Sequence, residues 1–171
     1  MRRFALFLGL FLSAAAHAQI LPQAPTIAAK SWLLMDYSTG QALASYNPDD
    51  RVEPASLTKL MTAYVVLSAL KEGRIRPDQA VSVSERAWKA QGSRMFIEPR
   101  RPVTVEELLR GMIVQSGNDA CIALAEAVAG SEEAFVQAMN REAQRLGLKG
   151  TRFANSTGLS DPQHYSTARD L

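Results

Sequence analysis

The chain has 171 residues, of which 47% are hydrophobic and 21% charged, proportions typical of one globular domain. Its single cysteine, Cys121, excludes an intramolecular disulfide, and we expect it to be a small core residue. The formal net charge of +2 gives no support for nucleic-acid binding, because Arg2 and Arg3 belong to a segment that we expect to be removed. Without that segment His164 is the one histidine left, so no zinc site of His and Cys ligands can be assembled. We expect no metal and no cofactor.

The N-terminus has the pattern of a signal peptide. Arg2 and Arg3 precede an apolar run over residues 4–16, which ends in the small-x-small triplet Ala16-His17-Ala18. The run is shorter than the roughly 20 residues that span a bilayer. We therefore expect an exported protein that is cleaved after Ala18 and acts in the periplasm or at the outer face of the cytoplasmic membrane. An uncleaved membrane anchor is the alternative.

The expected domain organisation is a signal peptide over residues 1–18, an extended lead-in over 19–27 and one domain from 28 to 171. In the domain, strands are predicted over 31–37 and 41–46, joined in a hairpin by Ser38-Thr39-Gly40. Further along, the patterns predict a helix over 56–71, a brief strand over 80–84, an irregular stretch to about 102, and helices over 104–114, 119–129 and 131–146. The last three helices have capping signals, among them the capping box that begins at Thr104.

The motif S-x-x-K occurs twice, at Ser56 to Lys59 and at Ser68 to Lys71, within one apolar segment that predicts a buried central helix. Position in the helix separates the two copies. Pro54 lies just before the helix, so Ser56 is at its N-terminus, where free N–H groups and the dipole favour a developing oxyanion. We therefore interpret Ser56 as the candidate nucleophile, and Ser68 and Lys71 as structural.

Lys59 lies one helical turn from Ser56, so its amine can reach back to the hydroxyl as a proton acceptor. The amine must be neutral, and lowering its pKa from about 10.4 to about 7 or 8 costs roughly 4 kcal/mol, which burial can supply. We expect the neighbours Leu57, Leu60 and Met61 to provide the apolar surroundings. The alternative is a solvated lysine in the first turn.

A second polar motif, Ser116-Gly117-Asn118, lies between two apolar helices. Its polar groups must find hydrogen-bond partners. Taken alone, the motif is best explained by helix capping, in which Ser116 closes one helix and Asn118 or Asp119 opens the next.

Together, S-x-x-K at Ser56 and S-x-N at Ser116 resemble the first two motifs of the penicillin-recognising serine enzymes. The resemblance is closest to the D-alanyl-D-alanine carboxypeptidases of the low-molecular-mass penicillin-binding proteins. It is carried by four stretches: Glu53 to Thr62, Leu109 to Met112, Gln115 to Ala120 and Tyr165 to Asp170.

The resemblance implies an α/β domain, an antiparallel sheet flanked by helices, and a two-step mechanism through a serine ester. Ser56 would attack the carbonyl between the two terminal D-alanines of a peptidoglycan pentapeptide, and Lys59 would accept its proton. Ser116 would relay a proton towards the leaving amine, Asn118 would hold the substrate amide, and the backbone N–H of Ser56 would form half of an oxyanion hole. β-Lactam antibiotics would be covalent inhibitors that stall at the ester.

One departure from the family pattern stands out. The third motif, K-T-G on a strand beside the serine, is absent between Asn118 and Leu171, and too few strands are predicted to complete the sheet. We therefore expect the chain to be the N-terminal part of a longer enzyme, inactive by itself. Membrane attachment would be possible only through a C-terminus that this sequence lacks.

Three alternatives to a carboxypeptidase stay open. A class A β-lactamase shares both motifs, but none of the four glutamates that follow Asn118 has an asparagine four residues on, as its deacylating E-x-x-x-N pattern requires. An endopeptidase of the same fold is not separated by the sequence. A non-catalytic remnant is the third, if the gene ends at Leu171.

Overall fold

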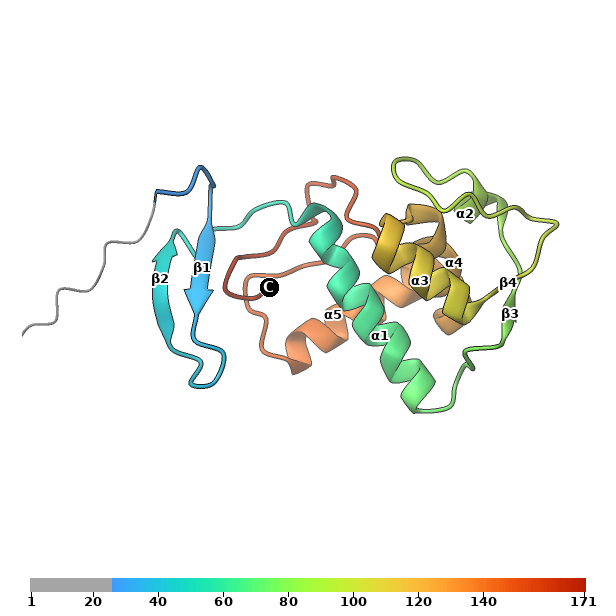
Figure 1. The fold of residues 1–171 in the computed structure, drawn as a ribbon, viewed down its shortest axis with the longest axis horizontal. Helices are drawn as coiled ribbons and strands as arrows, with labels where there is room; N and C mark the ends of the chain where they lie inside the picture. The colour runs from blue at the N-terminus through green and yellow to red at the C-terminus, as the bar shows by residue number, and fades with distance from the viewer. Residues whose placement is uncertain (1–25) are drawn as a thin grey trace, which may run out of the picture.

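The computed structural model describes residues 26–171, so the expected signal peptide and most of the lead-in lie outside the described residues. Two short antiparallel sheets and a group of helices make up this part of the chain (Figure 1). In chain order the elements are β1 (Trp32–Met35), β2 (Ala42–Tyr46), a 3-10 turn η1 (Ala55–Thr58), α1 (Lys59–Lys71), β3 (Ala80–Val81), α2 (Glu85–Trp88), β4 (Val103–Thr104), α3 (Val105–Gln115), α4 (Asn118–Ala129) and α5 (Glu132–Arg145).

The predicted hairpin is confirmed by β1 and β2, which pair antiparallel from Trp32 opposite Tyr46 onward. The turn is fixed by Asp36, whose carboxylate accepts hydrogen bonds from the backbone N–H and the hydroxyl of Thr39 at 2.8 and 2.7 Å. These bonds lower the pKa of Asp36. The hairpin stands at one end of the molecule, apart from the helices (Figure 1). Just beyond it, Asp49 forms an ion pair with Arg169.

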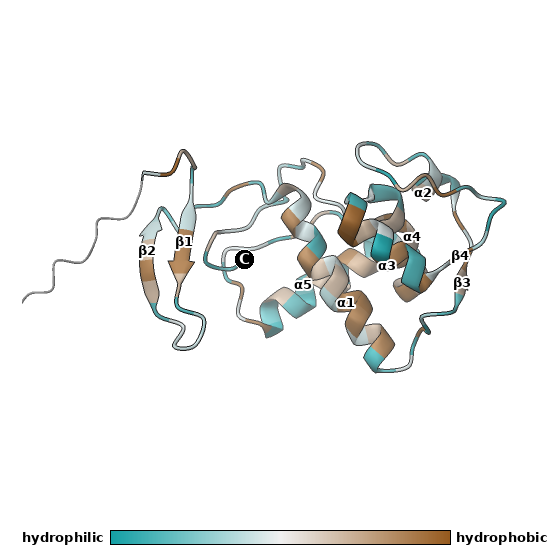
Figure 2. Ribbon diagram, viewed as in Figure 1, coloured by the Kyte–Doolittle hydropathy of each residue, from teal (hydrophilic) through white to brown (hydrophobic). Residues whose placement is uncertain are grey.

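The most deeply buried helix is α4, not α1 as the sequence predicted. Every residue from Asn118 to Ala125 is buried, and α4 contacts α1, α2, α3 and α5. Helix α1 packs against α3, α4 and α5 on one side only. Its other side continues the line of Leu57 in the η1 turn as a row of exposed apolar side chains, and we call the whole row the outer face of α1: Leu57, Leu60, Tyr64 and Leu67. The helix is therefore apolar on both sides (Figure 2), but it is covered on one.

Capping chemistry places the ends of α3 and α5 where the sequence predicted them. Thr104 accepts the N–H of Glu107 while the Glu107 carboxylate accepts the N–H of Thr104, a complete capping box. Ser131 caps α5 by accepting the N–H of Ala134 at 3.1 Å. The stretch predicted to be irregular contains α2, and β4 at its end pairs with β3. The predicted strand over 80–84 is only two residues long.

After α5 the chain forms no further helix or strand and makes only isolated β-bridges. It runs back between the hairpin and the helices (Figure 1). Side chains hold it in place. Asn140 on α5 donates to the carbonyl of Phe153 and accepts its N–H, at 2.8 and 2.9 Å. Asp170 accepts the N–H of Gly150 and the hydroxyl of Thr151. The segment is therefore ordered by side-chain bonds and by two isolated backbone bridges, Arg152 with Tyr165 and Val52 with Ser166, rather than by a sheet.

Residues 26–171 contain no helix that is both long and apolar enough to cross a membrane. Over the same range, the structure has no cluster of three His, Cys, Asp or Glu side chains suited to hold a metal ion.

Candidate active site

The two residues of the first S-x-x-K motif lie on either side of a helix boundary. Ser56 is exposed in η1, and Lys59 is buried as the first residue of α1. The predicted helix start at Ser56 is therefore a tighter 3-10 turn, whose first residue, Ala55, has a left-handed conformation with φ of 47°. Lys59 Nζ lies 3.2 Å from Ser56 Oγ, within reach for proton transfer.

The second motif comes to the same place from 60 residues further along the chain. Ser116 is the left-handed residue that ends α3, and Asn118 is the first residue of α4. Ser116 Oγ lies 3.0 Å from Ser56 Oγ. Asn118 Oδ1 accepts a hydrogen bond from Lys59 Nζ at 2.8 Å, and its Nδ2 donates to the carbonyl of Gln91 at 2.7 Å. Ser116 thus ends α3, as the capping interpretation predicted, but the cap of α4 is Gly117, without a side-chain hydrogen bond, and the Asn118 side chain bonds Lys59 instead.

Lys59 faces three acceptors, because the carbonyl of Thr157 also lies 2.7 Å from Nζ. Burial lowers the pKa of Lys59, whereas a Cys121 thiolate would raise it. Burial raises the pKa of Cys121 itself to about 12, so that thiol is neutral near pH 7. A neutral amine has two N–H groups and one lone pair. It can therefore donate to Asn118 and Thr157 while its lone pair faces Ser56.

Of the three neighbours expected to surround Lys59, only Met61 is buried. Leu57 and Leu60 lie on the outer face of α1 and are more than half exposed, at 54% and 59%. The helical repeat turns these side chains away from the amine, since residues one or two positions apart do not share a face. The surroundings of Lys59 come instead from α4, through Asn118 and Cys121, and from Thr157.

Thr157 belongs to a segment that sequence reasoning missed, which we call the 153–159 loop. Ser156 anchors it: its N–H and hydroxyl both donate to Glu132 Oε1, at 3.0 and 2.7 Å, and its carbonyl accepts from Thr62 at 2.7 Å. Glu132 is buried and pairs with Arg86 at 2.6 Å. The one signal in the sequence is the run Asn155 to Gly158, which has turn composition.

Gly158 lets the 153–159 loop pack directly against the turn that holds Ser56. Its φ is +91°, and a side chain there would collide with the carbonyl oxygen of Ala55. The strained backbone of Ala55 is therefore in contact with Gly158 beside the serine. Such strain persists only where the surrounding contacts over-determine it.

The remaining candidates lie away from this cluster. Ser68 is half-buried and Lys71 is exposed, and no hydrogen bond joins them in the described part of the chain. His164, expected in a polar loop, is in a loop but is only 3% exposed, and it bonds Thr58 rather than Ser56. It therefore does not complete a Ser-His-Asp triad in this structure.

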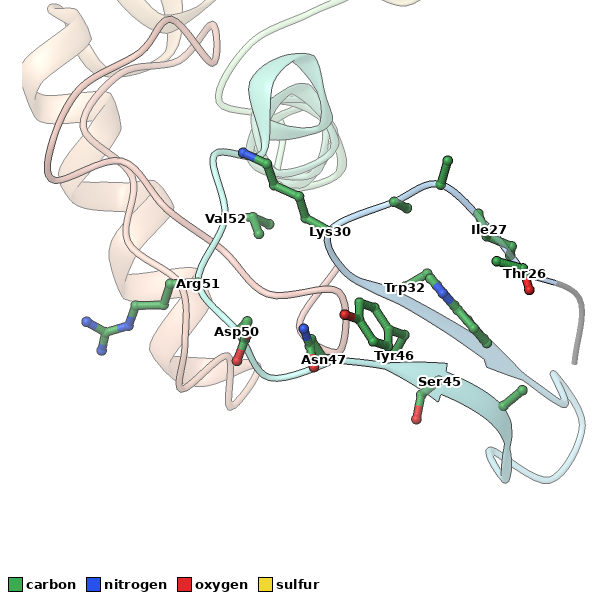
Figure 3. Close-up of a pocket in the computed structure, with 13 residues that line it drawn as sticks. Thr26, Ile27, Lys30, Trp32, Ser45, Tyr46, Asn47, Asp50, Arg51 and Val52 are labelled. Atoms are coloured by element: carbon green, nitrogen blue, oxygen red, sulfur yellow. The ribbon is translucent and has the colours of Figure 1, made fainter.

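A large open hollow lies elsewhere, beside the hairpin (Figure 3). Trp32, Tyr46 and Lys30 line it together with the chain around Asp50 and Val52. None of the residues of the two motifs lines this hollow, so it is separate from the candidate site.

Comparisons with known proteins agree with the two motifs. Residues 18–171 match the peptidase S11 family, described as D-alanyl-D-alanine carboxypeptidase. The D-alanyl-D-alanine carboxypeptidase DacC of Escherichia coli is 47% identical over 96% of this chain and 43% of its own length. DacF of Bacillus subtilis is 46% identical over 84% of this chain and 37% of its own length.

Solved structures give the same result. Penicillin-binding protein 5 of Haemophilus influenzae superimposes with a TM-score of 0.84 at 48% identity, over 86% of this chain and 44% of that protein. The chain thus spans less than half the length of these relatives. The residues matched by the family include both S-x-x-K and S-x-N. The structural match confirms the α/β fold expected from the resemblance. The chain belongs to the D-alanyl-D-alanine carboxypeptidase family.

Proposed function

We propose that this chain carries the nucleophile half of a serine D-alanyl-D-alanine carboxypeptidase that acts on peptidoglycan stem peptides. The observation that supports it most is the cluster of Ser56, Lys59 and Ser116, with the two serine hydroxyls 3.0 Å apart and the buried amine 3.2 Å from Ser56. An exposed hydroxyl beside a buried amine is the arrangement that nucleophilic catalysis needs.

In the proposed reaction Ser56 Oγ attacks the carbonyl between the terminal D-alanines while its proton passes to Lys59. The new ammonium keeps the acceptors Asn118 Oδ1 and Thr157 O. The peptide C–N bond then breaks, a proton reaches the leaving amine through Ser116, and D-alanine departs. Water hydrolyses the ester and restores Ser56. A β-lactam would follow the first step and remain as the ester.

Asn118 has two tasks in this proposal. Its Oδ1 orients Lys59, which the hydrogen bond at 2.8 Å supports. Its Nδ2 carries two N–H groups, of which one donates to the carbonyl of Gln91, so the other can donate to a substrate amide.

We further propose that the domain over residues 28–171 is completed by chain beyond Leu171, which would supply K-T-G, the second oxyanion donor and the rest of the sheet. The exposed outer face of α1 supports this, since large apolar patches on soluble proteins mark surfaces that another element covers. The coding sequence after Leu171 tests it. A K-T-G triplet there supports the enzyme, and a stop codon favours a non-catalytic remnant.

The proposal includes export through residues 1–18, action outside the cytoplasm, and membrane attachment only through a later segment. Carboxypeptidase action is favoured over endopeptidase action by the comparisons. The D-alanyl-D-alanine endopeptidase of Pseudomonas aeruginosa is 38% identical to this chain, against 47% for DacC of Escherichia coli.

Release of D-alanine tests the proposed activity. The complete protein is incubated with a stem pentapeptide that ends in D-Ala-D-Ala, with a D-Ala-L-Ala peptide as control. We expect one D-alanine per D-Ala-D-Ala peptide, no L-alanine from the control, and a rate at least about 100-fold lower for Ser116→Ala if it transfers the proton. Cleavage of cross-linked peptides without release of D-alanine would instead identify an endopeptidase, and rapid hydrolysis of penicillin a β-lactamase.

A further inference from the structure

His164 is buried and uses both ring nitrogens. Its Nδ1 accepts the backbone N–H of Ala154 at 3.0 Å, and its Nε2 lies 2.7 Å from the hydroxyl oxygen of Thr58. Because Nδ1 accepts, the proton of the neutral ring is on Nε2, which donates to Thr58. Phe153 packs edge-on against the ring, with centroids 5.8 Å apart. The tautomer and the orientation of the ring are therefore both fixed.

The two partners of His164 belong to the two sides of the candidate site. Thr58 is buried within the S-x-x-K motif, between Ser56 and Lys59. Ala154 belongs to the 153–159 loop, which presents the Thr157 carbonyl to Lys59. His164 thus bonds the turn that carries the nucleophile and the loop that holds the amine at the same time, without touching Ser56 or Lys59.

We propose that His164 is a positioning residue for acylation: it clamps the Ser56–Lys59 turn to the 153–159 loop through Thr58 and Ala154. This inference rests on the proposed function. The turn contains Ala55 in a strained conformation, so it needs contacts that hold it in place. Loss of the clamp would let the amine and the hydroxyl separate, and a misplacement of about 1 Å can cost about 100-fold in rate.

The charge state of His164 agrees with this role. Burial lowers its pKa, while the carboxylates of Asp161 and Glu53 act in the opposite direction. A second ring proton on Nδ1 would point at the N–H of Ala154 and break that bond. The clamp therefore requires the neutral ring that burial favours.

Acylation kinetics of the complete protein with a fluorescent penicillin test the proposal. His164→Leu removes both bonds at similar volume, and we expect the acylation rate constant to fall tenfold or more while the dissociation constant of the non-covalent complex stays within about twofold. His164→Gln, which can still donate and accept, should recover most of the rate. Thr58→Val should also slow acylation, and adding it to His164→Leu should cause little further loss, because both variants break the same clamp.

Met139→Ala is the matched control, since Met139 is fully buried in α5 and outside the site. We expect it to lower the melting temperature but to leave acylation per folded molecule unchanged. Nitrogen-15 NMR of the imidazole should show the proton on Nε2 and an unprotonated Nδ1 that accepts a hydrogen bond.

If the wild-type protein is acylated normally, any of three results would overturn the positioning role. The first is an unchanged acylation rate in both His164→Leu and Thr58→Val, and the second is a loss of rate in Met139→Ala equal to that in His164→Leu. The third is a proton on Nδ1 of His164. A wild-type protein that is not acylated overturns the proposed function, and this inference with it.

Discussion

At the scale of single residues, the pKa of Lys59 is subject to opposing influences. Burial lowers its pKa, whereas the bonds to Asn118 Oδ1 and Thr157 O favour the ammonium form. Lowering a pKa by one corresponds to about 1.4 kcal/mol in favour of the neutral amine. The site therefore resists charge before the attack on the substrate and has acceptors ready for the proton once it arrives.

The rate of penicillin acylation should consequently depend on the titration of Lys59. Only the neutral amine accepts the proton, so the rate should rise with pH through the pKa of Lys59 in the folded protein. Because burial lowers that pKa, the midpoint should lie below the ordinary value of 10.5. Stopped-flow measurement of the acylation rate constant across pH checks this.

Lys59→Arg is the companion variant, because a guanidinium cannot be deprotonated and should lower the rate about 100-fold or more. Lys71→Arg, the same change in the second S-x-x-K copy, should keep the wild-type rate and pH profile. A wild-type profile in Lys59→Arg would remove the amine from the mechanism.

Sequence reasoning at this scale identified the motif side chains that the structure brings together, but not their surroundings. Ser56, Lys59 and Ser116 were identifiable because short motifs and the polarity of a helix are local properties. Thr157 and His164 were not, because a carbonyl has no side-chain signature and because burial of a lone histidine depends on packing between residues about a hundred positions apart.

At the scale of elements, the site depends on contact between the η1 turn and the 153–159 loop. Gly158 makes the contact possible, because it has φ of +91° and its Cα lies against Ala55. The loop is anchored by Glu132 through Ser156 and by His164 through Ala154. The anchors hold the Thr157 carbonyl 2.7 Å from Lys59 Nζ.

Gly158→Ala should therefore be costly for both stability and acylation. The methyl group adds a collision with the backbone of Ala55 to the strain of a positive φ, for a total of about 3 kcal/mol. Gly130→Ala is the control, since Gly130 has φ of +83° but open space around it, and it should lose only about 1 kcal/mol. Denaturant unfolding of both variants of the complete protein measures the difference. Equal losses would show that the contact with Ala55 does not matter.

The predicted elements were most accurate where a cap marks their ends. The capping box at Thr104 and the serine cap at Ser131 fix α3 and α5 by local chemistry. The short α2 and the pairing of β3 with β4 were not predicted, because two-residue strands have no periodicity to detect.

At the scale of the whole molecule, the described residues lie on one side of Ser56, the proposed nucleophile. The helices that carry Lys59 and Asn118 are packed together, while the outer face of α1 and the two-stranded hairpin lack a covering layer among residues 26–171. The prediction of a buried central helix was wrong for α1, because only one of its two apolar sides is covered by the described residues, while Leu60, Tyr64 and Leu67 on the other side are exposed. Periodicity reports how many faces are apolar but not what covers each of them.

The central claim, that Ser56 is the nucleophile of a penicillin-binding enzyme, is tested most directly by intact-mass spectrometry of the complete protein after incubation with penicillin. We expect one covalent adduct in the wild type, no adduct in Ser56→Ala, and an undiminished adduct in Ser68→Ala. An adduct that survives in Ser56→Ala and disappears in Ser68→Ala would contradict the account.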